Sequence, residues 1–182
     1  MYHIYDLYCS QASLGISVRP EVREAWTIVK DAAGKAMDVL FGREDYLALQ
    51  AGPFLNEFYE KSSAVMAGND AQKLRVYSAH DVTVYYWMSA AKVRPKQGVP
   101  YYNAVFALEL RRVVETGKYV VLPLYASSPG QPVQYLKVEG CGTELCDIDE
   151  FREITAPYTL DEKTWRKECE FDEDIEIDDL SM

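Results

Sequence analysis

His80 and Asp81 stand side by side in the run Y-S-A-H-D-V-T-V, and their types are suited to phosphate chemistry. If the pair lies where a helix begins, unpaired N–H groups and partial positive charge favour a bound anion. His80 can then donate a hydrogen bond to a phosphoryl oxygen, and Asp81 can act as general acid for an alkoxide leaving group. For the dipeptide alone a simpler alternative stays open: Asp81 caps the helix and His80 is a turn residue.

Other chemistries find little support in the residues. No G-x-S-x-G elbow, P-loop or G-x-G-x-x-G run occurs, which disfavours a serine hydrolase or a nucleotide site. His3 and His80 are far apart and no H-x-x-x-H spacing exists, so no metal site is predicted. We therefore expect neither a metal nor a cofactor.

The elements around the pair follow from local patterns. Leu74, Val76 and Tyr77 favour a strand that leads into the pair, and residues 82–91 favour a buried helix after it, with Asp81 as N-cap. Apolar residues at helical spacing predict one helix from Pro20 to Gly42. A second helix is predicted around Pro53, ending at Gly68.

The second half of the chain predicts a sheet. Residues 104–110 and 119–125 read as an antiparallel hairpin joined by a turn at 115–117, with Pro123 favouring an edge or a bulge. Residues 133–138 predict a third strand and residues 149–154 a short helix, whereas 156–169 reads as irregular. Helices and strands interleave, so the predicted fold class is α/β.

Length and charge set further bounds. With 182 residues and 48% hydrophobic content, the chain suits one globular domain. The formal net charge of −10 disfavours nucleic acid or an anionic membrane surface as a partner. Much of this charge lies in residues 170–182, which the composition predicts to be a disordered acidic tail. No apolar run has the length of a membrane span, and the N-terminus does not read as a signal peptide.

The cysteines carry information about the compartment. Cys141 and Cys146 lie close together in G-C-G-T-E-L-C, which favours a short-loop disulfide over a metal site. A disulfide predicts an oxidising compartment, in tension with the absence of a signal peptide.

Several motifs in order resemble the C-terminal half of the histidine acid phosphatases of prostatic and lysosomal type. They are Y-S-A-H-D-V-T-V, V-P-Y-Y-N-A-V-F-A-L-E-L, L-K-V-E-G-C-G-T-E-L-C-D-I-D-E-F and W-R-K-E-C, with Y-D-L-Y-C and L-Q-A-G-P-F-L-N-E before them. The resemblance covers about residues 5–169. It implies a three-layer histidine phosphatase (phosphoglycerate mutase-like) α/β fold, phosphomonoester hydrolysis through a phosphohistidine without a metal, and a secreted or lysosomal location.

The same resemblance implies roles for individual residues. His80 matches the second phosphate-contacting histidine of the family, and Asp81 matches its proton donor to the leaving alcohol. Cys141 and Cys146 match an intact disulfide of the family. Cys9 and Cys169 are expected to be unpaired, since the family partner of Cys9 aligns with Val105 and that of Cys169 falls in the absent N-terminal half.

One departure decides the expected activity. The family's nucleophile lies in an R-H-G-x-R-x-P motif that does not occur here, and His3 lacks the flanking Arg, Gly and Pro. Residues 1–169 are therefore expected to form an incomplete domain that lacks the nucleophile and does not turn over substrate by itself. A full-length relative or an N-terminal half would be the partner. The alternatives are a non-catalytic interaction chain or pseudo-enzyme, and a truncated gene product.

An incomplete domain of this kind predicts a stability problem. In the family fold the nucleophile-bearing strand is central to a parallel sheet, so its absence exposes the neighbouring strand and an apolar face. We therefore expect the chain to be marginally stable, to aggregate, or to associate with a partner.

Overall fold

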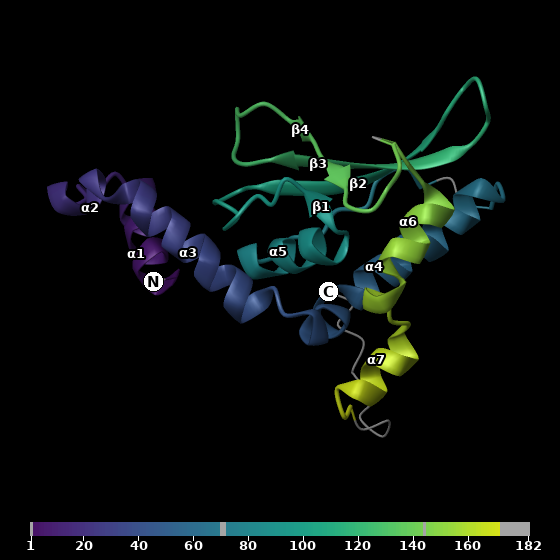
Figure 1. Ribbon diagram of the computed structural model, residues 1–182, viewed down its shortest axis with the longest axis horizontal. Coiled ribbons are helices and arrows are strands. Elements are labelled where there is room, and N and C mark those ends of the chain that lie inside the picture. The colour runs from purple at the N-terminus through teal and green to yellow at the C-terminus, as the bar shows by residue number, and fades with distance from the viewer. Residues whose placement is uncertain (1, 70–71, 144, 172–182) are drawn as a thin grey trace.

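The computed structural model describes residues 2–69, 72–143 and 145–171, and it has the predicted mixed α/β composition (Figure 1). The helices are α1 (Tyr2–Ser13), α2 (Pro20–Glu24), α3 (Trp26–Phe41), α4 (Glu44–Met66), α5 (Asp81–Ala90), α6 (Ile148–Thr155) and α7 (Glu162–Glu168), with a 3₁₀ turn η1 (Ala156–Tyr158). The strands are β1 (Val93–Arg94), β2 (Val105–Arg112), β3 (Tyr119–Ala126), β4 (Gln134–Tyr135), β5 (Lys137–Val138) and β6 (Cys146–Asp147).

The predicted hairpin is the centre of the sheet. β2 and β3 pair antiparallel along their full length, from Val105 opposite Ala126 to Arg112 opposite Tyr119. On its other side β3 pairs with β6 and with β4, and β1 pairs separately with β5. Every one of these pairings within the described part of the chain is antiparallel. Helix α5 lies against the strands and also packs on α4 (Figure 1).

Pro123 does not lie in an edge strand, as its ring had suggested. It pairs with Leu108 in the middle of the sheet, because β3 has neighbours on both sides. The second side is interrupted at this point: β6 pairs with Val120 and Val121, and β4 pairs with Leu124 and Tyr125. Pro123 thus falls in the gap between two short strands, where a missing N–H donor breaks no ladder bond on that side.

The main core lies between α4, α5, α6 and the sheet. Leu55 and Phe151 are fully buried in it, together with Val121 of β3 and Leu136, which lies between β4 and β5. A second, smaller cluster joins α1, α3 and α5; its buried members are Tyr5, Cys9, Val29, Ala33, Met37, Tyr85 and Val99. Helix α5 contributes to both, with Met88 in the first cluster and Tyr85 in the second, so it fixes α1 and α3 to the rest of the molecule.

The strand predicted over Leu74, Val76 and Tyr77 is not formed. Residues 72–80 form no regular secondary structure and are exposed, with Leu74 at 74% and Val76 at 80% of their full exposure. The β-propensity of these residues needs a neighbouring strand to become a ladder, and no described strand lies beside them.

Three other boundaries were wrong. The helix predicted from Pro20 to Gly42 is divided at Ala25 into α2 and α3, although it begins and ends as expected. The strand predicted over 133–138 is divided between β4 and β5, which belong to different sheets. The stretch predicted as irregular, 156–169, contains η1 and α7, and Asp161 caps α7 by accepting the Thr164 N–H at 2.8 Å.

The first two residues of the predicted acidic tail, 170 and 171, belong to the described part of the chain. Phe171 stacks on Trp165 of α7 with ring centroids 6.5 Å apart, so residues 170 and 171 pack with the domain. The remaining predicted tail, 172–182, lies outside the described residues. No helix in the described ranges is both long and apolar enough to cross a membrane.

The predicted disulfide is present between Cys141 and Cys146, whose Cα atoms are 5.6 Å apart. Glu150 of α6 holds the same loop, because its carboxylate accepts the Gly142 N–H at 3.0 Å. Cys9 is buried and Cys169 is exposed, and neither forms a disulfide with another described residue.

Candidate functional site

His80 and Asp81 lie at the N-terminus of α5, one position from where the sequence placed them. The helix begins at Asp81 and His80 is the N-cap, with extended backbone angles and no side-chain cap bond. Asp81 therefore does not cap the helix in the usual way. Its Oδ1 accepts the N–H of Val82 at 2.8 Å, which still satisfies one of the free donors of the first turn.

Asp81 is also held from a distant part of the chain. The Tyr2 hydroxyl of α1 donates to Asp81 Oδ2 at 2.5 Å, so both carboxylate oxygens have a donor. Burial, followed by the hydrogen bond to Asp81, raises the pKa of Tyr2 well above its usual value, so this hydroxyl keeps its proton as a donor. By contrast, the exposed His80 imidazole makes no hydrogen bond or ion pair within the described ranges.

Both residues line a cleft of about 700 Å³. Its walls are α1, the segment 76–81 and the loop 100–105 that leads into β2. Five tyrosines face it: Tyr2, Tyr5, Tyr77, Tyr101 and Tyr102. The cleft is large enough for a small phosphate ester together with its organic group.

The charged residues that line the cleft are not those of a strong phosphate-binding site. Asp6 and Asp81 are its acidic residues, and no lysine or arginine is among the described residues that line it. The groups available to an anion are the N–H groups at the α5 N-terminus and the imidazole of His80. Such a site attracts phosphate weakly, since the strong contacts to phosphate come from guanidinium and ammonium groups.

The sequence offered little signal for the α1 side of the cleft. Tyr2 and Asp6 were not predicted, because residues 2–13 show no clear apolar periodicity. Gly15 was the available signal, since it ends α1 in a left-handed conformation while the Ile16 N–H donates to the Gln11 carbonyl at 2.9 Å. Tyr101 and Tyr102, in the loop before β2, also line the cleft, and Tyr102 shares a 2.7 Å hydrogen bond with Ser10 of α1 that joins two of its walls.

Cys9 and Val105, the two positions that the resemblance pairs, line this same cleft from opposite walls. Cys9 comes from α1 and Val105 from the start of β2, where its side chain is 58% exposed. Burial raises the pKa of the Cys9 thiol, which keeps it protonated and poorly nucleophilic.

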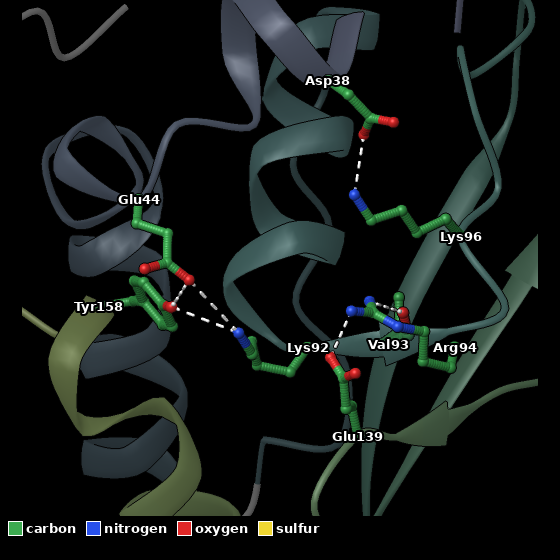
Figure 2. A network of polar contacts seen from close by, with 8 residues as sticks. All are labelled: Asp38, Glu44, Lys92, Val93, Arg94, Lys96, Glu139 and Tyr158. Atoms are coloured by element: carbon green, nitrogen blue, oxygen red, sulfur yellow. Dashed lines mark hydrogen bonds and ion pairs between the residues drawn. The ribbon is translucent and has the colours of Figure 1, made fainter. Parts of the chain in front are cut away.

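A second cavity, of about 130 Å³, lies on the other side of α5 and gathers basic residues (Figure 2). Lys92, Arg94 and Lys96 line it, but each meets a carboxylate. Lys96 binds Asp38 at 3.0 Å, Arg94 binds Glu139, and Lys92 lies 3.7 Å from Glu44.

This network joins elements rather than presenting free positive charge. The Lys92 ammonium also donates to the Tyr158 hydroxyl at 3.3 Å, and that hydroxyl donates to Glu44 at 3.0 Å. Burial tends to raise the pKa of Asp38, but hydrogen bonds from Tyr85 and Lys96 outweigh it and hold that pKa below its usual value. The paired charges connect α3, α4, β1, β5 and η1, so we assign this cavity a structural role.

The comparisons with known proteins point to one group of relatives. The chain is 23% identical to human lysosomal acid phosphatase over 175 residues and 26% identical to the rat lysosomal protein over 182 residues. It is 27% identical to bovine prostatic acid phosphatase over 171 residues. No family model matches the chain.

These matches cover 91 to 96% of the chain but 40 to 42% of the relatives, so the chain spans about two fifths of their length. They confirm the resemblance to the C-terminal part of the prostatic and lysosomal acid phosphatases that the motifs indicated.

Proposed function

We propose that this chain carries the phosphate-contacting histidine and the general acid of an acid phosphatase site, supplied by His80 and Asp81. One observation carries the proposal. The H-D pair of the family motif lies at the N-terminus of α5 and lines the large cleft, in a chain similar to acid phosphatases over most of its length. The substrate class is then a phosphomonoester, and the fold is an incomplete histidine phosphatase fold.

His80 and Asp81 have different roles in this proposal. His80 donates to a phosphoryl oxygen, while Asp81 gives a proton to the departing alkoxide. To do so, Asp81 must be released by Tyr2, whose hydroxyl occupies Oδ2. The covalent step needs a nucleophilic histidine and an arginine clamp, and the R-H-G-x-R-x-P run that carries them in the family does not occur in these 182 residues.

We therefore propose that these 182 residues bind phosphate weakly and do not hydrolyse esters alone. A full-length relative or an N-terminal half is the partner that would complete the site. The Cys141–Cys146 disulfide, together with the lysosomal relatives, supports a secreted or lysosomal location.

The activity of the purified chain tests the main statement. With p-nitrophenyl phosphate at pH 5, we expect no turnover above a blank without protein. Turnover that His80→Ala abolishes would contradict the proposal, because it would require a complete site within this chain. The matched control is His3→Ala, an exposed histidine that does not line the cleft.

Binding of inorganic phosphate, followed by ³¹P line broadening, tests the role of His80 without turnover. We expect a Kd in about the millimolar range, because a helix N-terminus and one histidine are weak donors compared with an arginine clamp. His80→Ala should weaken this binding several-fold, because it removes a hydrogen-bond donor to the phosphoryl oxygen, and His3→Ala should not. Equal effects of the two substitutions would remove His80 from the site.

Asp81 can be tested once a complementary N-terminal half restores turnover. Asp81→Ala should slow alkyl phosphates more than aryl phosphates, since protonation matters most for a poor leaving group. Equal loss on both ester types would count against the general-acid role.

A second candidate, a non-catalytic interaction chain or pseudo-enzyme, is favoured by the charge of the cleft. Five tyrosines and two acidic residues line it without a lysine or arginine in the described ranges, which suits an uncharged or aromatic ligand better than phosphate. Failure to bind phosphate at any tested concentration, with the fold intact by circular dichroism, would select this candidate.

A further inference from the structure

Helix α3 extends away from the sheet and leaves one face exposed to solvent (Figure 1). Its buried side consists of Val29, Ala33 and Met37, which pack in the smaller cluster with α1 and α5. Lys35 lies two residues beyond the fully buried Ala33, about 200° around a helix of about 3.6 residues per turn. The exposed face is therefore on the opposite side of α3 from α1 and α5.

The residues of this face follow a regular spacing. Ile28, Ala32, Lys35 and Val39 are separated by four, three and four positions, which is typical of a stripe that packs against another helix. Ile28 and Val39, at the two ends of the stripe, are 69% and 71% exposed. Large apolar side chains at this spacing on a solvent-facing side indicate a surface that associates.

The same face carries two opposite charges that the fold of the chain does not use. Asp31 and Lys35 are exposed, and neither side chain forms an ion pair or a hydrogen bond within the described part of the chain. Asp38, the other acidic residue of α3, is held by Tyr85 and Lys96. Asp31 and Lys35 are thus available to a second molecule.

Two copies of this face match one another when the helices run antiparallel about a two-fold axis. Ile28 then lies opposite Val39 of the second copy, and Ala32 lies opposite Lys35 of the second copy. Asp31 precedes Ala32 and comes beside that same Lys35, and the symmetry repeats each contact. This arrangement covers the apolar ends of both stripes and forms two intermolecular ion pairs.

The parallel arrangement is disfavoured by the same residues. When two parallel helices pair in register, each residue meets its own copy, so Asp31 faces Asp31 and Lys35 faces Lys35. Like charges placed together across an interface oppose association. The order of the two charges along the helix therefore selects the antiparallel pairing.

We infer that two copies of the chain associate through the exposed faces of α3, antiparallel about a two-fold axis, with Asp31 of each copy beside Lys35 of the other. The contact is short, because α3 advances only about 16 Å from Ile28 to Val39 at about 1.5 Å per residue. Stable complexes bury about 800 Å² on each partner, so a contact of this length gives a weak dimer with a Kd of about 0.1 mM.

The dimer leaves the cleft open. The cleft is lined from α1, the segment 76–81 and the loop 100–105, whereas the exposed face of α3 is turned away from α1. The contact also leaves residues 73–79 uncovered for an N-terminal half. The inference does not depend on phosphate chemistry and holds for either function proposed above.

Sedimentation velocity of the full chain between about 10 µM and about 1 mM tests the pairing, since this range spans the expected Kd. The unmodified chain should show a monomer–dimer equilibrium. Asp31→Lys and Lys35→Asp should each weaken it at least about ten-fold, because each places two pairs of like charges in the contact. An equal mixture of the two variants should associate again, because every charged contact then joins a lysine to an aspartate.

The matched control is Lys30→Asp, which gives the chain the same net charge as Lys35→Asp. Lys30 is exposed on the same helix, but its charge acts on the Cys9 thiol of α1 and so lies on the α1 side. Lys30→Asp should leave the dimer intact. Mixed with Asp31→Lys, it should restore association far less than Lys35→Asp does.

Several results would overturn the inference. A monomer at every concentration would show that the face does not associate, and association that neither charge variant weakens would place the contact on another surface. Species larger than a dimer would contradict a closed two-fold contact. Single variants that dissociate, stay folded by circular dichroism and fail to associate on mixing would exclude the antiparallel arrangement.

Discussion

Two tyrosine hydroxyls, those of Tyr2 and Tyr59, form hydrogen bonds with other side chains and have raised pKa values. Tyr2 donates to Asp81 in the cleft, and Tyr59 hydrogen-bonds with Thr155 in the main core. Thr155 is fully buried and also donates to the Phe151 carbonyl at 2.9 Å. Burial raises the pKa of Tyr59 to about 12, although Thr155 and Arg152 act in the opposite direction. The free energy of unfolding should therefore fall at alkaline pH, where Tyr59 loses its proton more readily in the unfolded chain.

Replacing Tyr59 by Phe should flatten that dependence. The folded state holds the Tyr59 proton up to about pH 12, whereas an unfolded tyrosine loses it near pH 10. The stabilising contribution is thus complete below pH 10 and is lost as the pH rises toward 12, by up to about 2 kcal/mol. Urea unfolding of wild type and Tyr59→Phe at pH 8 and at pH 11.5 measures this change in the free energy of unfolding.

The advantage of wild type over Tyr59→Phe should fall by about 2 kcal/mol at the higher pH, so the variant should become the more stable of the two. At pH 8 the variant should lose about 1 kcal/mol for the missing hydrogen bond. Tyr46→Phe, on an exposed tyrosine of α4, is the control. A constant difference at the two pH values would show that Tyr59 ionises equally in both states.

At the scale of elements, close packing fixes α4 against the turn η1 and the residues after it. A side chain at Gly52 would place its Cβ 2.9 Å from the Leu160 backbone nitrogen and 3.0 Å from the Tyr158 carbonyl oxygen. Backbone atoms at this distance cannot move aside cheaply, so glycine is required by close approach rather than by its backbone angles. Gly34 in α3 has open space around it.

This contrast predicts opposite signs for one substitution. Gly52→Ala should destabilise the protein by about 1–3 kcal/mol, because overpacking outweighs the gain in helix propensity. Gly34→Ala should stabilise it by about 0.5–1 kcal/mol. Thermal unfolding measures both, and stabilisation by Gly52→Ala would show that the contact with residues 158–160 is loose.

On the scale of the whole molecule, α1, α2 and α3 extend away from the sheet and are attached through the smaller cluster (Figure 1). Their outer faces are apolar: Ile28 is 69% exposed and Val39 is 71% exposed on α3, and Leu7 is 53% exposed on α1. Apolar patches of this kind promote association.

We expect the purified chain to elute in a concentration-dependent manner in size-exclusion chromatography. Ile28→Gln/Val39→Gln should shift it toward the monomer without lowering its melting temperature, because these side chains contribute little to the core. Val114→Gln, on a valine that is 91% exposed in the β2–β3 turn region, is the control. A monomer at all concentrations with a sharp, reversible melt would contradict both this prediction and the expected marginal stability.

Local patterns were sufficient for much of this protein. Three kinds of feature depend on residues near one another in sequence. They are the apolar patterns that predicted α4 and α5, the hairpin of β2 and β3, and the Cys141–Cys146 disulfide. The H-D pair was found in the same way, and its place at a helix N-terminus was right to within one residue. Short-range sterics, propensities and turn chemistry decide such features before any distant contact forms.

Tertiary structure decided what those elements do together. Residues 74–77 have strand propensity but form no strand, because a ladder needs a neighbour that local sequence cannot supply. Tyr2 meets Asp81 across 79 positions, and the tyrosine-rich cleft without a lining lysine or arginine arises only when α1, the segment 76–81 and the loop 100–105 converge. The sequence by itself determined that the histidine and the acid stand together at a helix start. Only packing between distant segments decided which donor holds the acid and what charge surrounds it.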